Sequence, residues 1–160
     1  MVERLPSFEK ILKKPCLLKR HFGVGLREYL GAAEWMMSYG NQNVILCERG
    51  ITASHTHDEN ARFILDVNFF PAARKYSHLP IICDPSHAAG ISDYVPALAQ
   101  AGIAAGADGI IIEFHPDPEK SVVDRSQAIN VETFLKTAKK CRQIWEITNN
   151  IENQHTWKIK

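Results

Sequence analysis

The chain contains four short runs of apolar residues, at positions 16–18, 44–47, 81–83 and 110–112. Each run is continuous rather than alternately apolar and polar, which is typical of strands covered on both faces, as in a parallel sheet. The starts of the runs lie roughly 30 residues apart, an ordinary spacing for βαβ units. The sequence therefore predicts a parallel sheet built from successive βα units.

A helical pattern follows each apolar run. The four predicted helices span residues 26–39, 68–76, 94–105 and 131–147. Pro96 suits the first turn of the third helix, because its missing N–H has no intrahelical partner there. Asn130 suits the N-cap of the fourth helix. We therefore predict four βα units within residues 1–148, followed by a polar tail at residues 149–160.

Parallel strands joined in this way leave two main folds, a closed (β/α)8 barrel and an open, doubly wound sheet. A (β/α)8 barrel typically needs about 250 residues, and this chain has 160. Four βα units would supply half of such a barrel. The predicted class is therefore α/β, and a barrel would need strands that these four units do not provide.

Composition argues against several partners and compartments. The net charge is +1 with His neutral, so no global field favours nucleic acid or a membrane surface. The apolar runs are too short to cross a bilayer, and the first 14 residues lack the apolar stretch of a secretory signal. The four cysteines form no CxxC pair, so we expect reduced thiols in a cytoplasmic protein.

Ionisable residues follow every apolar run. They are Lys19 and Arg20, then Glu48 and Arg49, then Asp84 and His87, then Glu113 and His115. Active sites of α/β folds are built at the carboxyl ends of the strands, where the βα loops open. Four such ends in four units favour a functional site over ordinary polar strand ends.

The residues at these ends fall into two chemical groups. Lys19, Arg20 and Arg49 are cations that suit a phosphate or carboxylate; the alternative is a solvated strand end for Lys19 and Arg20, and pairing with a neighbour for Arg49. His87 and Glu113, with an Asp, would suit a divalent ion such as Mn, Fe, Zn or Co. Asp124 lies in a polar loop, and its spacing alone would not single it out.

Several longer motifs resemble one enzyme family. They are KPCLLKR at 14–20, NVILCERG at 43–50, LPIICDPSH at 79–87, GADG at 106–109 and IEFHPDPEK at 112–120. In order and spacing they resemble the microbial 3-deoxy-7-phosphoheptulonate (DAHP) synthases, in the short branch that is also similar to 3-deoxy-octulosonate 8-phosphate synthases. The resemblance runs from about residue 14 to about residue 134 and implies the C-terminal half of a (β/α)8 TIM barrel.

The resemblance also implies a reaction, the aldol-like condensation of phosphoenolpyruvate with erythrose 4-phosphate at the start of the shikimate pathway. By the motif match, Lys19 would bind the carboxylate of phosphoenolpyruvate and Arg49 its phosphate. The predicted site then comprises catalytic Lys19, Arg49 and His87, substrate-binding Lys19, Arg20, Arg49 and Asp84, and metal-binding His87, Glu113 and Asp124. Asp124 enters this set only through the resemblance.

Two departures from the family pattern leave alternatives open. The earlier strands are absent, and in the family they carry a fourth metal ligand, a Cys, and loops for both substrates. We therefore expect a complementary N-terminal half or a homo-oligomer; a non-catalytic metal- and phosphate-binding remnant is the alternative. Residues 52–59 (TASHTHDE) differ from the usual loop, which leaves the acceptor open to arabinose 5-phosphate or an amino-sugar analogue. His55 and His57 are either an added metal pair or part of a solvated loop.

Overall fold

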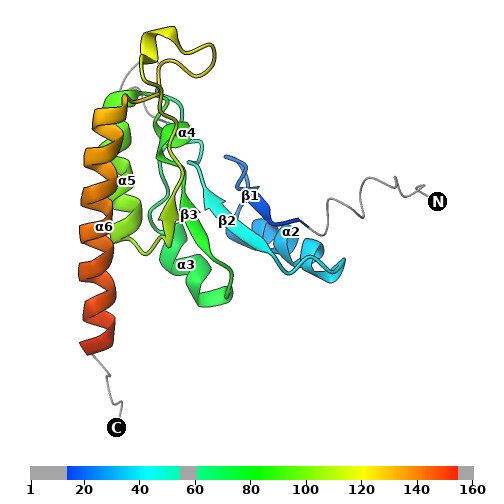
Figure 1. Cartoon of the computed structure of the whole chain (residues 1–160). Helices are drawn as coiled ribbons and strands as arrows, with labels where there is room; N and C mark the ends of the chain where they lie inside the picture. Colours follow the sequence, from blue (N-terminus) through cyan, green and yellow to red (C-terminus); the bar gives the residue numbers. More distant parts are fainter. Residues whose placement is uncertain (1–13, 55–60, 155–160) are drawn as a thin grey trace, which may run out of the picture.

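The computed structural model describes residues 14–54 and 61–154, and its centre is a four-stranded parallel sheet (Figure 1). The strands lie side by side in chain order, β1-β2-β3-β4, and every neighbouring pair is parallel. They are β1 (Cys16–Lys19), β2 (Val44–Glu48), β3 (Ile81–Cys83) and β4 (Gly109–Ile110). The predicted order of parallel strands is therefore confirmed.

Five α-helices and two short 3-10 helices connect or follow these strands in the described part of the chain. They are α2 (Leu26–Ser38), α3 (Phe69–Tyr76), α4 (Pro85–Ala89), η1 (Ser92–Tyr94), α5 (Val95–Ala104), η2 (Pro118–Lys120) and α6 (Val131–Gln154). Asn130 caps α6, since its Oδ1 accepts from the N–H of Thr133 at 2.8 Å. Pro96 lies in the first turn of α5. Both helix starts agree with the sequence prediction.

Three local features differ from the sequence prediction. The last helix does not end at residue 147 but continues to Gln154. Helix α4 occupies a stretch in which no helix was predicted; Pro85 starts it and Gly90 ends it in a left-handed conformation with φ 72°. Strand β4 ends at Ile110 rather than at residue 112, and further along the chain the backbone of Phe114 forms an isolated parallel bridge with Ile129.

The main core lies between the sheet and its helices. Residues of one strand face, such as Leu46, Ile81 and Cys83, are fully buried there with Phe70 of α3. Gly102 of α5 packs directly against Cys83, since a β-carbon at position 102 would meet Cys83 Sγ at 2.6 Å. Close contact between helix and strand at this point requires glycine.

The opposite face of the sheet is much less covered. It presents Leu17, Ile45, Ile82 and Ile111, and none of these belongs to the main core cluster. Leu17 and Ile111 are each 37% exposed, and Ile45 and Ile82 are half-buried. We refer to these four side chains as the uncovered face. Apolar strand residues in continuous runs were expected to be buried on both sides, and on this side the described chain leaves them open.

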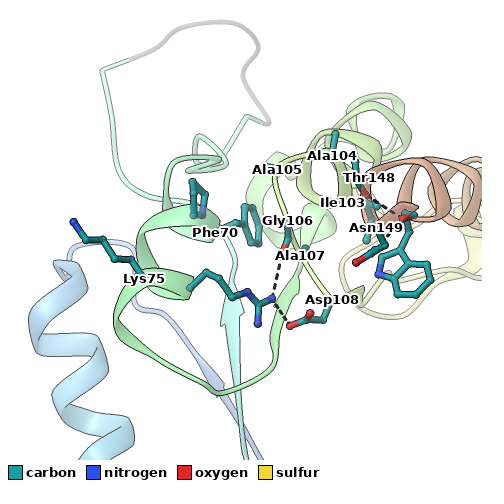
Figure 2. A pocket seen from close by; sticks show the side chains of 13 residues that line it. Phe70, Lys75, Ile103, Ala104, Ala105, Gly106, Ala107, Asp108, Thr148 and Asn149 are labelled. Atoms are coloured by element: carbon teal, nitrogen blue, oxygen red, sulfur yellow. Dashed lines mark hydrogen bonds and ion pairs between the residues drawn. The ribbon is translucent and has the colours of Figure 1, made fainter. Parts of the chain in front are cut away.

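A groove lies at the amino ends of β3 and β4 (Figure 2). The charged residues that follow the apolar runs lie at the opposite, carboxyl ends of the strands. Arg74 of α3 bonds to Asp108 at 2.7 Å, and Asp108 accepts the N–H of Ile81 at 2.7 Å. These contacts tie the starts of the two strands to α3, so Arg74 and Asp108 already have structural partners in the groove. Among the described helices, none has the length and apolar character needed to cross a membrane.

Candidate metal and anion site

Some of the charged residues at the strand ends, namely Lys19, Arg49 and Asp84, lie on the same side of the sheet as the uncovered face. Lys19 pairs in register with Cys47, and Cys47 pairs with Ile82, so these three side chains point to the same side. Because strand side chains alternate, Arg49 and Asp84 follow two positions later on that side. The parallel register therefore places the carboxyl ends of β1, β2 and β3 next to one another, although they are far apart in sequence.

Three candidate metal ligands meet beside these strand ends. His87 comes from α4, Glu113 from the segment after β4, and Asp124 from the loop before α6. One ligand atom of each lies within 4.8 Å of the others. Asp124 adopts φ 50°, a left-handed conformation that is unusual for a non-glycine residue. The structure thus brings the three predicted ligands together, including the one that spacing did not select.

Asp84 fixes the ring of His87. Its side chain caps α4 by accepting the N–H of His87 at 3.1 Å, and its Oδ2 lies 2.8 Å from His87 Nδ1. An ionised carboxylate only accepts hydrogen bonds, so the ring proton is assigned to Nδ1 and Nε2 is left with a lone pair. Metal-ligating histidines are commonly oriented by a carboxylate in this way.

The free nitrogen of His87 faces a negative charge. Nε2 lies 3.2 Å from Glu113 Oε1. A lone pair and a carboxylate oxygen at this distance repel each other unless a cation, either a proton or a metal ion, lies between or beside them. His, Glu and Asp together form a donor set that suits a divalent transition metal. The residues present therefore fit a metal ion.

Two cations lie at the carboxyl ends of β1 and β2. Lys19 Nζ bonds to Asp84 Oδ2 at 3.0 Å, so one buried carboxylate holds both Lys19 and His87. Arg49 directly follows β2, and its Nε is buried with no hydrogen-bond partner among the described residues. A buried donor without a partner is costly, which makes Arg49 a group prepared for an anion.

Arg20 was predicted to bind the anionic substrate, but its side chain lies away from Lys19 and Asp84. Its side chain points to the helix side of the sheet, where it contacts Glu48 at 3.0 Å and Asp66 at 2.8 Å. Burial alone would lower the pKa of Arg20, but the hydrogen bonds to Asp66 and Glu48 raise it above its usual value. Arg20 is therefore a charged group inside a buried ion-pair network.

Sequence reasoning missed some polar residues around the site. Gln127 is 1% exposed and donates to Glu113 at 3.0 Å, and Arg62 lies 3.7 Å from Asp124. The polar loop that contains Gln127 carries no periodic signal that would have selected it. The predicted histidines of the loop, His55 and His57, lie outside the described residues.

The fold and the site together define a class, the (β/α)8 barrels whose strand ends carry metal-ligand and anion-binding side chains; the described sheet supplies four parallel strands of such a barrel. The model of the DAHP synthetase I family matches residues 10–151. The chain belongs to this family, as its motifs predicted.

Similar proteins of known name agree with this assignment. The phospho-2-dehydro-3-deoxyheptonate aldolase of Thermotoga maritima is 43% identical over 141 residues, which are 88% of this chain and 41% of that protein. The 2-dehydro-3-deoxyphosphooctonate aldolase of Geotalea uraniireducens is 31% identical over 119 residues, 68% of this chain and 42% of that protein. The chain therefore spans about two-fifths of the length of these relatives.

Solved structures support the barrel assignment. A crystal structure of the Thermotoga maritima DAHP synthase matches with a TM-score of 0.78 at 43% identity, covering 85% of this chain and 39% of that one. A truncated form of the Thermotoga maritima enzyme also has a TM-score of 0.78, at 40% identity, covering 89% of this chain and 55% of that one. The four βα units are thus a partial barrel of the DAHP synthase type.

Proposed function

We propose that this chain supplies the C-terminal half of a DAHP synthase, which condenses phosphoenolpyruvate with erythrose 4-phosphate in the cytoplasm. The observation that carries the proposal is the arrangement around Asp84. This buried carboxylate joins Lys19 to His87 of the metal cluster, and Arg49 directly follows the neighbouring strand β2. An anionic substrate and a metal ion would thus be held next to each other on the same side of the sheet.

Lys19 and Arg49 are proposed to bind phosphoenolpyruvate, Lys19 at the carboxylate and Arg49 at the phosphate. Fixed cations neutralise the charges of this substrate without reorganising when it binds. Lys19 is held by Asp84, and the partnerless Nε of Arg49 would donate to the anion. Arg20 is assigned no direct contact; we propose that its ion pairs hold the ends of β1 and β2, from which Lys19 and Arg49 project.

His87, Glu113 and Asp124 are proposed to bind a divalent ion, Mn, Fe, Zn or Co. When bound, such an ion would supply a Lewis acid for the aldehyde oxygen of the second substrate or orient an activated water. Asp84 contributes by keeping the proton on Nδ1 of His87 and Nε2 available.

Catalysis is proposed to need a partner that covers the open side of the sheet. Among the described strands, β1 and β4 each pair on one side only, and the uncovered face exposes Leu17 and Ile111. Open strand edges and exposed apolar surface favour association. The occupant would be a complementary N-terminal half or, in a homo-oligomer, a second copy of the chain.

The proposal can be tested by co-expressing this chain with the N-terminal part of the Thermotoga maritima relative. Phosphate release from phosphoenolpyruvate, in the presence of erythrose 4-phosphate and Mn²⁺, should rise well above that of either half alone. His87→Ala should abolish the activity, and His78→Ala, at an exposed position before β3, should not. Background rates from a mixture that forms a stable complex would contradict the proposal and favour a non-catalytic module.

The acceptor can be tested in the same assay. The similarity to 2-dehydro-3-deoxyphosphooctonate aldolases, at 31% identity for the Geotalea uraniireducens protein, makes a second sugar phosphate a specific alternative. Replacing erythrose 4-phosphate by arabinose 5-phosphate should reduce the rate strongly. A faster reaction with arabinose 5-phosphate would assign the chain to the second reaction.

A further inference from the structure

Gln127 is a buried amide that links two charged side chains. It is 1% exposed and lies between the loop that carries Asp124 and helix α6. Its Nε2 donates to Glu113 Oε2 at 3.0 Å, and its Oε1 accepts from Arg62 Nη1 at 3.1 Å. Both ends of the amide are therefore occupied.

The chemistry of the two partners determines the orientation of this amide. A guanidinium only donates hydrogen bonds and an ionised carboxylate only accepts them. The amide oxygen must therefore face Arg62 and the amide nitrogen must face Glu113. A carboxylate at position 127 would repel Glu113, and an apolar side chain would leave Glu113 without this donor, so a glutamine suits both partners.

The contacts of Gln127 reach two of the candidate metal ligands. Glu113 uses Oε2 for Gln127, which directs its other oxygen, Oε1, toward His87 Nε2 at 3.2 Å. Arg62, held by Gln127, lies 3.7 Å from Asp124 Oδ1. The backbone N–H of Gln127 also donates to the carbonyl of Asp124 at 3.1 Å, which closes the turn that presents Asp124.

We propose that Gln127 is a positioning residue for the metal site, a role that rests on the function proposed above. Through direct contact it orients the carboxylate of Glu113, and through Arg62 and the backbone turn it orients that of Asp124. Arg62 comes from the segment between β2 and α3.

The proposal predicts weaker metal binding when the amide is lost. Gln127→Met keeps the length of the side chain but removes both hydrogen bonds. Loss of a partner behind a ligand typically weakens metal binding about 10- to 100-fold, and we expect a rise of this size in the Mn²⁺ dissociation constant, measured by electron paramagnetic resonance of free Mn²⁺. Gln143→Met, the same change at an exposed position of α6, should leave the constant unchanged.

Two further measurements separate positioning from a purely structural role. The visible spectrum of bound Co²⁺ should change in Gln127→Met, because Glu113 is reoriented, and a loss of stability alone would not change it. Arg62→Met, at a side chain that is 41% exposed, should fold normally and give a smaller rise in the Mn²⁺ constant. If Gln127→Met does not fold, Arg62→Met tests the proposal in its place. An unchanged Mn²⁺ dissociation constant in Arg62→Met would then overturn the proposal.

The outcomes distinguish this proposal from the proposed function. If the chain binds Mn²⁺, His87→Ala loses binding and Gln127→Met binds as the unmodified chain does, the positioning role is overturned while the metal site stands. If Mn²⁺ binding is absent or does not depend on His87, the metal site itself is overturned, and the role of Gln127 with it.

Discussion

Asp84 holds His87 by two contacts, one to the backbone N–H at 3.1 Å and one to Nδ1 of the ring at 2.8 Å. The three-residue separation makes both possible, because Asp84 is the N-cap of α4 and His87 is in its first turn. A single carboxylate thus starts the helix and orients the candidate ligand. The start of α4 and the orientation of the His87 ring therefore both depend on the carboxylate oxygens of Asp84.

Replacing Asp84 by Asn should weaken metal binding more than it changes the fold. The amide oxygen of Asn still accepts from His87, but the negative charge that favours the Nδ1–H form and pairs with Lys19 is lost. We expect Mn²⁺ affinity to fall by about tenfold or more, measured by calorimetric titration. Asp93→Asn, at an exposed residue of η1, is the matched control and should bind normally.

Removing the charge of Arg20 should destabilise the chain strongly. Arg20→Met leaves Glu48, which is fully buried, without its cation. Breaking a buried pair from one side typically costs about 3–5 kcal/mol, and we expect a loss of this size in the free energy of unfolding by denaturant titration.

The control for Arg20 is an ion pair on the surface. Arg142→Met removes the contact of Arg142 with Glu146, in which both side chains are exposed, and should cost at most about 1 kcal/mol. Equal losses in the Arg20 and Arg142 variants would contradict the assignment of Arg20 to a buried network.

Two glycine substitutions should have opposite effects on stability. A β-carbon at Gly102 would lie 2.6 Å from Cys83 Sγ, so Gly102→Ala should destabilise by about 1–3 kcal/mol through overpacking. Gly31 of α2 has no atom within 4 Å of the corresponding position, and Gly31→Ala should stabilise the helix by about 0.5–1 kcal/mol. Thermal melting of both variants checks the prediction, and a stabilised Gly102→Ala would contradict the close packing of α5 on β3.

The buried thiols predict a loss of stability at alkaline pH. Burial raises the pKa of Cys47 from 9.0 to about 12, and burial also raises the pKa of Cys83. Above about pH 9 the unfolded chain loses these protons while the folded chain keeps them. The free energy of unfolding should therefore fall as pH rises from 9 toward 12, by about 1.4 kcal/mol per pH unit for Cys47, and Cys83 should add to the fall.

Denaturant titrations across this pH range check the alkaline prediction. The Cys47→Ala variant should start from a lower stability but lose it less steeply with pH, because one of the titrating thiols is gone. A slope equal to that of the unmodified chain would show that Cys47 ionises as readily in the folded state as in the unfolded state.

Much of the fold was predictable because its signals are local. Apolar runs marked the strands, and glycines such as Gly50, Gly90 and Gly106 stand where turns need a positive φ, which all three have. These features depend on backbone sterics and on neighbouring residues, which a sequence displays directly. The bridge between Phe114 and Ile129 and helix α4 were missed, because the first joins two segments after β4 and the second depends on a cap next to the site.

The amino-acid sequence by itself determined the order of the βα units and the concentration of charge at the carboxyl ends of the strands. Only the tertiary structure decided which charges face the site. Lys19 and Arg20 are neighbours in the chain, yet strand alternation directs Lys19 to Asp84 and Arg20 to the buried Glu48. Likewise, the closeness of Asp124 and Gln127 to Glu113 arises where the loop before α6 folds back, and contacts between segments so far apart in sequence leave no periodic trace in it.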